Sequence, residues 1–184
     1  VDGLLCGQPF NTFTKALPCV SVLFCKIVDF ESWVSVVDPS ELVSVLNRMF
    51  GTFDQSCAHR NVMKIETVSE VYFACSGINQ EGEQDDDTAA AALAAVQVAV
   101  DMLYFASRVT VTVSERAAQK MNLDGERRAM SIKVGINSGR VITGVVGARK
   151  PQFSIYGDTV NTASRMAAFC PRSNAIQISS ATYD

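Results

Sequence analysis

The order of apolar and polar positions predicts a domain that mixes strands with helices. Residues 19–27 (CVSVLFCKI) are almost wholly apolar and rich in β-formers, which is typical of a strand covered on both faces. From Pro39 onward, apolar residues instead recur at helical spacing. We expect this helix to start after Asp38, which suits the N-cap position, and to end near His59.

Two strands and a second helix are expected in the middle of the chain. Residues 62–67 and 71–76 are short apolar runs around a polar turn, the pattern of a β-hairpin. Residues 79–87 are acidic and rich in turn formers, so we predict an exposed loop and, after it, a helix as far as residue 107. Residues 110–128 are polar and weakly patterned, and we interpret them as an extension of that helix or as an insertion.

The last third of the chain predicts a second hairpin. Its strands are expected over 131–137 and 141–146, because the segment Ser138-Gly139-Arg140 between them is typical of a turn. Further elements are a short strand over 153–156, a helix over 158–169 capped by Asp158, and a final strand over 176–179. This order of strands and helices indicates an α+β fold, with a ferredoxin-like antiparallel sheet and helices packed on one face.

Composition and charge limit the size and the partners of the domain. A chain of 184 residues suits one domain, which we place at 19–184 after an N-terminal lead-in at 1–18. No apolar run approaches the ~20 residues of a membrane-spanning helix, so we expect that this domain itself does not span a membrane. The net charge of -3 offers no basic surface to a phosphate backbone, which argues against nucleic acid as a partner.

The cysteines indicate a reducing compartment. The chain has six cysteines without a CxxC pair and a single histidine, so we expect no zinc site. Cys25 and Cys75 lie in apolar strand candidates, where a free thiol behaves as a small apolar side chain. We therefore expect a cytoplasmic location, either of a soluble protein or of the cytosolic domain of a membrane protein.

Four segments, taken together, resemble the catalytic domains of class III adenylyl and guanylyl cyclases. They are SVLFCKIVDF at 21–30, MKIETVSEVYFACSG at 63–77, VGINSGRVITGVVG at 134–147 and PQFSIYGDTVNTASRM at 151–166. The resemblance implies a head-to-tail dimer with two composite sites at the interface. In each site one subunit supplies two metal-binding aspartates and a phosphate-binding turn, and the other supplies a base-reading pair and an Asn/Arg pair. The family normally continues through further strands, so the resemblance also implies that the sequence ending at Asp184 lacks the family's last strands.

The base-reading positions of the family match Glu66 and Ser154. Guanine presents N1–H and an N2 amino group as donors, and a carboxylate can accept from both, whereas adenine N1 is itself an acceptor. Glu66 therefore favours GTP. Guanylyl members usually carry Cys at the second position and adenylyl members Asp; Ser154 differs from both, and its hydroxyl can donate to guanine O6. The alternative interpretation of Glu66 is an exposed strand residue without a ligand.

The transition-state positions of the family match Asn161 and Arg165. The two residues are four apart on a predicted helix, so they project from one face. In such cyclases the arginine stabilises charge on the transferred phosphate and the asparagine orients the ribose. Alone, the sequence NTASR would more often be an ordinary polar helix face. Its setting within GDTVNTASRM is what matches the family.

The metal-binding positions depart from the family. Its FxDIVGFT motif appears here as FCKIVDFE, which puts Lys26 at the first metal aspartate, Asp29 at the glycine of the phosphate-binding turn and Glu31 at its threonine. Its GDAY motif appears as SEVY, so Glu70 replaces the second aspartate and Ser69 the turn glycine. An ammonium group repels Mg²⁺ and removes an oxygen ligand. We therefore predict no metal site in this chain, and an ion pair between Lys26 and Glu70 at the vacated position.

Together, the kept and lost positions imply one half of a guanylyl cyclase that converts GTP to cGMP and pyrophosphate. The expected cofactor is Mg²⁺ or Mn²⁺, bound mainly by a second cyclase domain with intact aspartates, in the same or another chain. Without that partner the domain is expected to be inactive. Degenerate halves of this kind resemble those of protist membrane enzymes in which a P4-ATPase-like region precedes paired cyclase domains.

Three alternatives stay open at this point. The first is a catalytically silent, cyclase-like domain that serves regulation or dimerisation. The second is an active homodimer that uses Glu70 and Asp29 as unconventional metal ligands. The third is a generic ferredoxin-like binding domain in which the four segments occur by chance.

Overall fold

The structure is a computed structural model that describes residues 14–78, 85–113, 119, 127–147 and 149–184. Most of the predicted lead-in and of the predicted loop at 79–87 lies outside these residues, so both stay predictions.

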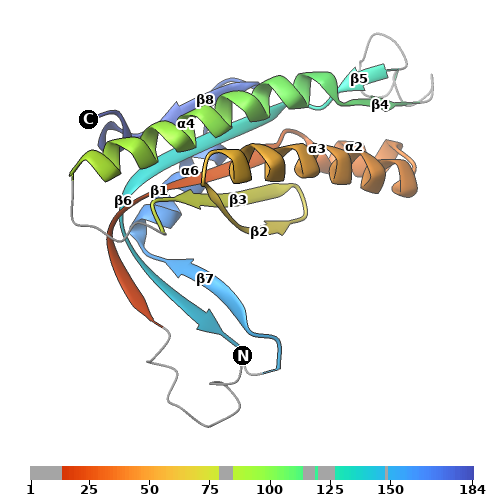
Figure 1. Cartoon of the computed structure of the whole chain (residues 1–184). Helices are drawn as coiled ribbons and strands as arrows, with labels where there is room; N and C mark the ends of the chain where they lie inside the picture. Colours follow the sequence, from red (N-terminus) through yellow and green to blue (C-terminus); the bar gives the residue numbers. More distant parts are fainter. Residues whose placement is uncertain (1–13, 79–84, 114–118, 120–126, 148) are drawn as a thin grey trace.

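A six-stranded sheet forms the centre of the domain. Its strand order is β2-β3-β1-β6-β7, and β8 pairs with β6. All of these pairings are antiparallel except that of β8 with β6. One end of β1 and β6, together with β7, extends away from the helices as a curved arm (Figure 1). The strands are β1 (Lys15–Ile27), β2 (Met63–Val68), β3 (Val71–Ser76), β6 (Ile132–Val146), β7 (Gln152–Tyr156) and β8 (Ala175–Ile178).

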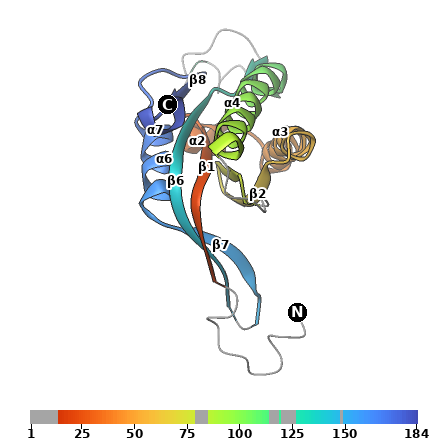
Figure 2. The same ribbon diagram turned by 60° about the vertical axis from the view of Figure 1, so that its left-hand side comes forward.

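Helices lie on both faces of this sheet (Figure 2). Because side chains alternate along a strand, β1 contributes to both sides of the core. Leu23 and Cys25 belong to a first cluster with residues of α3 and α4, whereas Val20 and Val22 belong to a second cluster with a residue of α6. The helices are α2 (Phe30–Val36), α3 (Pro39–His59), α4 (Asp85–Arg108), α6 (Asp158–Ala168) and α7 (Ser180–Tyr183).

The predicted fold class is confirmed, with one difference in the layers. The antiparallel sheet is present, and the long helices α3 and α4 share one face as expected. Helix α6 packs on the opposite face, close to the β6 backbone at Gly135. A Cβ atom at Gly135 would lie 2.2 Å from the backbone nitrogen of Ala167, so only glycine allows this approach.

Helix α3 has the boundaries that its sequence predicts. The Asp38 carboxylate accepts hydrogen bonds from the backbone N–H of Ser40 at 2.9 Å and of Glu41 at 3.4 Å. Hydrogen bonds from the Ser40 hydroxyl and backbone lower the pKa of Asp38. Pro39 takes the first helical position, and the helix ends at His59. The predictions for β1, the β2-β3 hairpin, α4, β7 and β8 are also confirmed, with shifts of a few residues at their ends.

The second predicted hairpin is wrong, because β6 is one continuous strand. Gly139, in the segment typical of a turn, pairs with Val20 of β1 at a point where the register shifts. Ser138 is buried, and its hydroxyl forms a hydrogen bond of 2.7 Å with the hydroxyl of Ser21. A segment whose polar residues form hydrogen bonds inside a sheet can therefore have the same sequence pattern as a turn.

The polar stretch after α4 does not extend that helix. β4 (Thr110–Thr112) and β5 (Arg127–Ala129) pair instead as a separate antiparallel ribbon. Side chains of α3 hold the first of these strands. The Thr112 N–H donates to Glu41 Oε1 at 2.9 Å, and Arg48 donates to the Thr110 carbonyl at 3.4 Å. Our interpretation of this stretch as an insertion stays a prediction.

Helix α6 begins differently from the prediction. Gly157 holds the N-cap position, and Asp158 is the first helical residue, without a side-chain cap hydrogen bond. A carboxylate in the first turn still interacts favourably with the helix dipole. Thr159 fixes this turn to β6, because its hydroxyl donates to the Arg140 carbonyl at 2.7 Å and its own carbonyl accepts from the Asn137 amide at 3.1 Å.

Helix α4 corrects the expectation that no apolar run reaches membrane-spanning length. From Thr88 to Arg108 it is long and apolar enough, by length and composition alone, to cross a membrane. One side of it lies in the first core cluster, where Ala95, Val98 and Met102 are fully buried. A core helix meets the same criterion, and this packing accounts for part of the apolar character of α4, since Leu93, Val100 and Tyr104 are exposed.

Candidate functional site

Glu66 lies on the edge strand β2, half-buried, and its carboxylate is held by a residue from the other end of the sheet. Gln152 Nε2, at the start of β7, donates to Glu66 Oε2 at 3.0 Å. Because β2 and β7 are the two ends of the strand path, this hydrogen bond requires the sheet to bend back toward itself. The carboxylate therefore has a fixed orientation.

Ser154 lies on β7, two residues after Gln152, so both side chains project from one face of that strand. Ser154 is half-buried and pairs with Gly144 of β6, which presents no side chain beside it. Gln152, which donates to Glu66, therefore lies on the same face of β7 as Ser154. The sequence prediction missed Gln152, although the period of two along a strand would have placed it beside Ser154.

Asn161 and Arg165 lie one turn apart on α6, and both are exposed. The buried residues of this helix, Thr159, Ala163 and Ala167, face the sheet and so leave the other two side chains free to reach a ligand. Among the described residues, no hydrogen bond or ion pair joins Asn161 or Arg165 to Glu66 or Ser154. The structure gives the two predicted pairs separate places in the fold.

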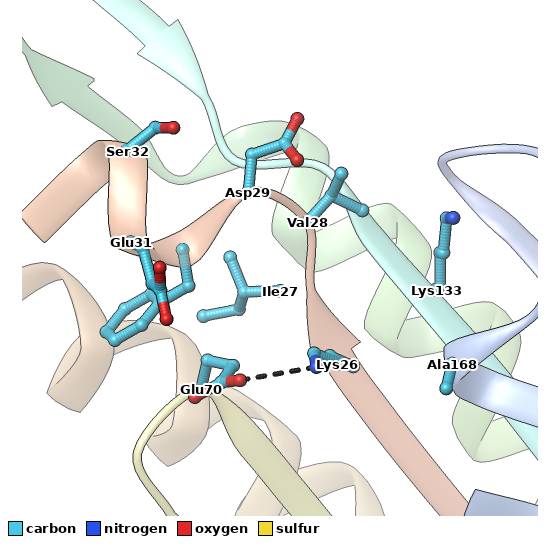
Figure 3. A pocket seen from close by; sticks show the side chains of 10 residues that line it. Lys26, Ile27, Val28, Asp29, Glu31, Ser32, Glu70, Lys133 and Ala168 are labelled. Carbon is cyan, nitrogen blue, oxygen red and sulfur yellow. Dashed lines mark ion pairs between the residues drawn. The ribbon is translucent and has the colours of Figure 1, made fainter. Parts of the chain in front are cut away.

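The altered metal positions meet at the end of β1. The Lys26 ammonium lies 3.4 Å from Glu70 Oε1, and the two side chains are 45% and 23% exposed (Figure 3). This confirms the predicted ion pair. The pair lines a pocket of about 410 Å³, together with Asp29, Glu31 and Lys133.

Glu70 is ionised in this arrangement. Burial by itself would raise the pKa of Glu70, but the hydrogen bonds from its own backbone N–H and from Ser69, and the neighbouring Lys26 ammonium, lower it overall. The turn that carries Glu70 is also tied to the end of β1, because the Ile27 N–H donates to the Glu70 carbonyl at 3.1 Å.

Two residues of this region adopt a backbone conformation that favours glycine. Asp29 and Ser69 both have a φ of 52°. These are the positions at which the cyclase motifs carry glycine. A left-handed conformation costs a non-glycine residue about 1 kcal/mol. Both turns therefore have the left-handed backbone conformation although neither residue is a glycine.

The charges in the pocket do not suit a divalent ion. Lys26 is paired with Lys133 in the β1-β6 register, so two ammonium groups start from neighbouring strands. The Asp29 carboxylate points away from Glu70 in Figure 3, and the two do not converge on one point. This arrangement argues against the homodimer hypothesis, in which Glu70 and Asp29 would share a metal ion.

Comparisons with known proteins agree with the motifs. Residues 13–184 match the family described as the adenylate and guanylate cyclase catalytic domain. Guanylate cyclase beta of Plasmodium berghei is 34% identical over 174 residues, which cover 90% of this chain. A receptor-type guanylate cyclase of Caenorhabditis elegans is 30% identical and covers the whole chain. The guanylate cyclase domain of RhGC from Catenaria anguillulae, solved in complex with GTP, has a TM-score of 0.75 at 29% identity and covers 92% of this chain and 82% of its own.

The match covers the domain but only part of the curated relatives. The chain spans 6% of the length of the Plasmodium berghei protein and 13% of the Caenorhabditis elegans receptor. Within the chain, the family match includes every described strand and helix. It therefore applies to the whole fold, including the sheet that carries Glu66 and the helix that carries Arg165. This chain is a member of the adenylate and guanylate cyclase catalytic domain family.

Proposed function

We propose that this domain is the half of a guanylate cyclase that reads the guanine base and stabilises the transition state. The observation that carries the proposal is the ion pair between Lys26 and Glu70, the residues that the cyclase motifs match to the family's two metal aspartates. Glu66, Asn161 and Arg165 lie elsewhere in the fold and keep the residue types that the family uses. A half that is completed by a partner can lose its metal-binding residues as long as it keeps its base-reading and transition-state residues.

Glu66 selects the base in this proposal. Its carboxylate accepts from guanine N1–H and N2, and the Gln152 amide donates to Oε2 of the same carboxylate at 3.0 Å. Adenine would place its N1 lone pair against the carboxylate and leave both unpaired. Ser154 donates its hydroxyl to guanine O6. The substrate is therefore GTP rather than ATP.

Asn161 and Arg165 act on the sugar and the phosphate. In the reaction the ribose 3'-oxygen forms a bond to the α-phosphorus, the bond from that phosphorus to the pyrophosphate oxygen breaks, and the 3'-hydroxyl proton leaves. Arg165 places its positive charge where negative charge develops on the α-phosphate, and Asn161 orients the ribose. Both side chains are exposed on one face of α6, as a site completed by a partner requires.

The metal and the partner belong to the other half. Cyclase domains of this family use divalent metal ions and function as dimers. The residues of this chain at the metal positions do not fit such an ion. We therefore assign Mg²⁺ or Mn²⁺ to a second cyclase domain that keeps both aspartates, and we derive no step through a metal bound here. The domain would then act in the cytoplasm, as part of a soluble or a membrane-attached enzyme, since the relatives include both soluble subunits and receptor types.

The test compares this chain alone with the same chain mixed with a cyclase domain that retains both aspartates. The measurement is cGMP and cAMP formation from GTP and ATP with Mn²⁺. We expect activity in the mixture only, and with GTP only. Activity of the chain alone would contradict the role given to Lys26. A mixture that forms no cGMP would contradict the proposed function.

A second candidate is a regulatory domain without catalysis. The same ion pair supports it, because a Lys26–Glu70 pair would close one composite site of the dimer to metal. In this case Arg165 would have no catalytic role, and its substitution in the assembled enzyme would leave turnover unchanged.

A further inference from the structure

Strand β2 contains an irregularity immediately before Glu66. Lys64 pairs with Ala74 of β3, but Glu66 pairs with Phe73, so Ile65 is an extra residue in β2. This is a β-bulge, in which two residues of one strand oppose one of the other.

The bulge puts Lys64 and Glu66 on opposite faces of the sheet. Side chains opposite each other in a ladder point to the same face. Ala74 belongs to the first core cluster, under α3 and α4, whereas Phe73 belongs to the second cluster, on the side of α6. Without the bulge, Lys64 and Glu66 would share a face, because they are two residues apart. With it, Lys64 faces α3 and Glu66 lies on the side of α6.

A cluster on α3 holds the residue before the bulge. Lys64 Nζ lies 2.9 Å from both carboxylate oxygens of Asp54, and the hydroxyl of Tyr72 donates to the same carboxylate at 2.6 Å. Tyr72 is fully buried, so Asp54 is anchored by a residue that cannot move freely. On the other side of the bulge, Ile65 packs against the second core cluster.

Strand β2 needs such an anchor because it is an edge strand. Only β3 pairs with it among the described strands, so one ladder alone opposes a shift of register. The hairpin turn after Val68 fixes the pairing of Glu66 with Phe73, whereas the segment before the bulge lies farther from that turn. A bulge re-aims the side chains next to it, so the way in which this segment is held affects the direction of Glu66.

We propose that Asp54, acting through Lys64, is a positioning residue for guanine recognition: it holds β2 at the bulge and thereby fixes the direction in which Glu66 points toward the base. The inference rests on the proposed role of Glu66. It assigns a part in base selection to a helix that the substrate does not touch.

The test removes the link between α3 and β2 in the assembled cyclase, with this domain paired to one that keeps both metal aspartates. Lys64→Met deletes the ammonium group, keeps most of the stem, and leaves the Tyr72–Asp54 hydrogen bond in place. Arg60→Met is the matched control. Arg60, at the end of α3, also forms an ion pair with a carboxylate, since its Nε atom lies 3.0 Å from Oδ2 of Asp101 on α4. Both variants are assayed well below their melting temperatures, with GTP and with ATP.

We expect Lys64→Met to lower the GTP-to-ATP ratio of kcat/KM about threefold to tenfold, through a higher KM for GTP, with kcat changed less than about twofold. Lys64→Arg, which can restore the ion pair, should recover the ratio. Arg60→Met should leave the ratio unchanged. Equal ratios for Lys64→Met and Arg60→Met would overturn the inference, because a merely structural role would affect stability alone.

A reference variant separates this inference from the proposed function. Glu66→Ala should lower the same ratio about tenfold to a hundredfold, since one charge-assisted contact to the base is lost. If Glu66→Ala lowers the ratio and Lys64→Met does not, Glu66 reads the base without help from Asp54. If Glu66→Ala also leaves the ratio unchanged, the proposed function itself is wrong.

Discussion

The proposed base-reading side of the domain keeps the residue types of the cyclase motifs. The former metal side, by which we mean the region of Lys26 and Glu70, has other side chains at the motif positions. On the first, Gln152 Nε2 donates a hydrogen bond of 3.0 Å to Glu66 Oε2. Helix α6 carries Asn161 and Arg165 with exposed side chains. On the second, Lys26 and Glu70 form an ion pair. Fold and chemistry are therefore separable: the same sheet supports both sides, and only one of them keeps the family's residues.

The turns of the altered side show how this separation is possible. Asp29 and Ser69 keep a left-handed conformation although they are not glycine. The surrounding hydrogen bonds fix that conformation, since the Asp29 carbonyl accepts from the N–H of Ser32 and of Trp33 at 3.0 and 3.3 Å. A dimer of two different halves needs only one working composite site. The former metal side can thus change its chemistry as long as it keeps its shape.

The largest expected effect tests whether the retained side is catalytic at all. Arg165→Ala in the assembled enzyme should lower kcat for cGMP formation about 10²- to 10³-fold, because the charge that stabilises the transferred phosphate is lost. KM for GTP should change much less. Arg172→Ala, an exposed arginine beyond the end of α6, is the matched control. Unchanged turnover in Arg165→Ala would favour the regulatory domain instead.

A smaller effect is expected from reversing the base-reading charge. Glu66→Lys replaces an acceptor for guanine N1–H by a donor that can serve adenine N1. The GTP-to-ATP ratio of kcat/KM should fall about a hundredfold. The exposed Glu31→Lys supplies the same charge change on the other side of the domain and should leave the ratio near that of the wild type. A preserved ratio in Glu66→Lys would show that other groups read the base.

The sequence proposes candidate site residues but not the contacts between them. Cyclase motifs suggest Glu66, Ser154, Asn161 and Arg165, because each motif is local in the chain, and their roles stay predictions. The Gln152–Glu66 hydrogen bond joins residues 86 positions apart, and no local pattern contains it. Its existence depends on the curvature of the whole sheet.

The errors in the fold have a common physical reason. Ser138 and Gly139 look like a turn because polar residues and glycine are rare in strands. In the fold, Ser138 bonds to Ser21 and Gly139 pairs with Val20 of a distant strand. The helix alternative for Thr110 is wrong for the same reason, because Thr110 pairs with Ala129 of a strand that begins only at Arg127. Tertiary partners override the local preference in each case.

Restoring the metal ligands would sharpen the comparison from the altered side. A variant with Lys26→Asp, Asp29→Gly, Glu31→Thr and Glu70→Asp removes the ammonium group and supplies two carboxylates, one at the end of β1 and one in the turn between β2 and β3. It should bind Mn²⁺ about tenfold more tightly than the wild-type domain, as measured by electron paramagnetic resonance of free Mn²⁺. Lys26→Met is the control, because it removes the charge without adding a ligand. Equal binding by all three proteins would show that more than side chains was lost.

The smallest effect concerns what the Lys26–Glu70 pair contributes to stability. Because the folded pKa of Glu70 is lowered, its contribution is present at pH values above the unfolded pKa of about 4.3 and is lost as the pH falls through the folded pKa. The pair is partly exposed, so Glu70→Gln should cost less than about 1 kcal/mol at pH 7, a shift of about 2–4 °C in Tm at most. Thermal denaturation from pH 7 to pH 3 should show this difference shrinking toward zero. A difference that stays constant over this range would mean that Glu70 stabilises the fold through packing. The charge of the Lys26–Glu70 pair would then contribute little to the stability of the former metal side.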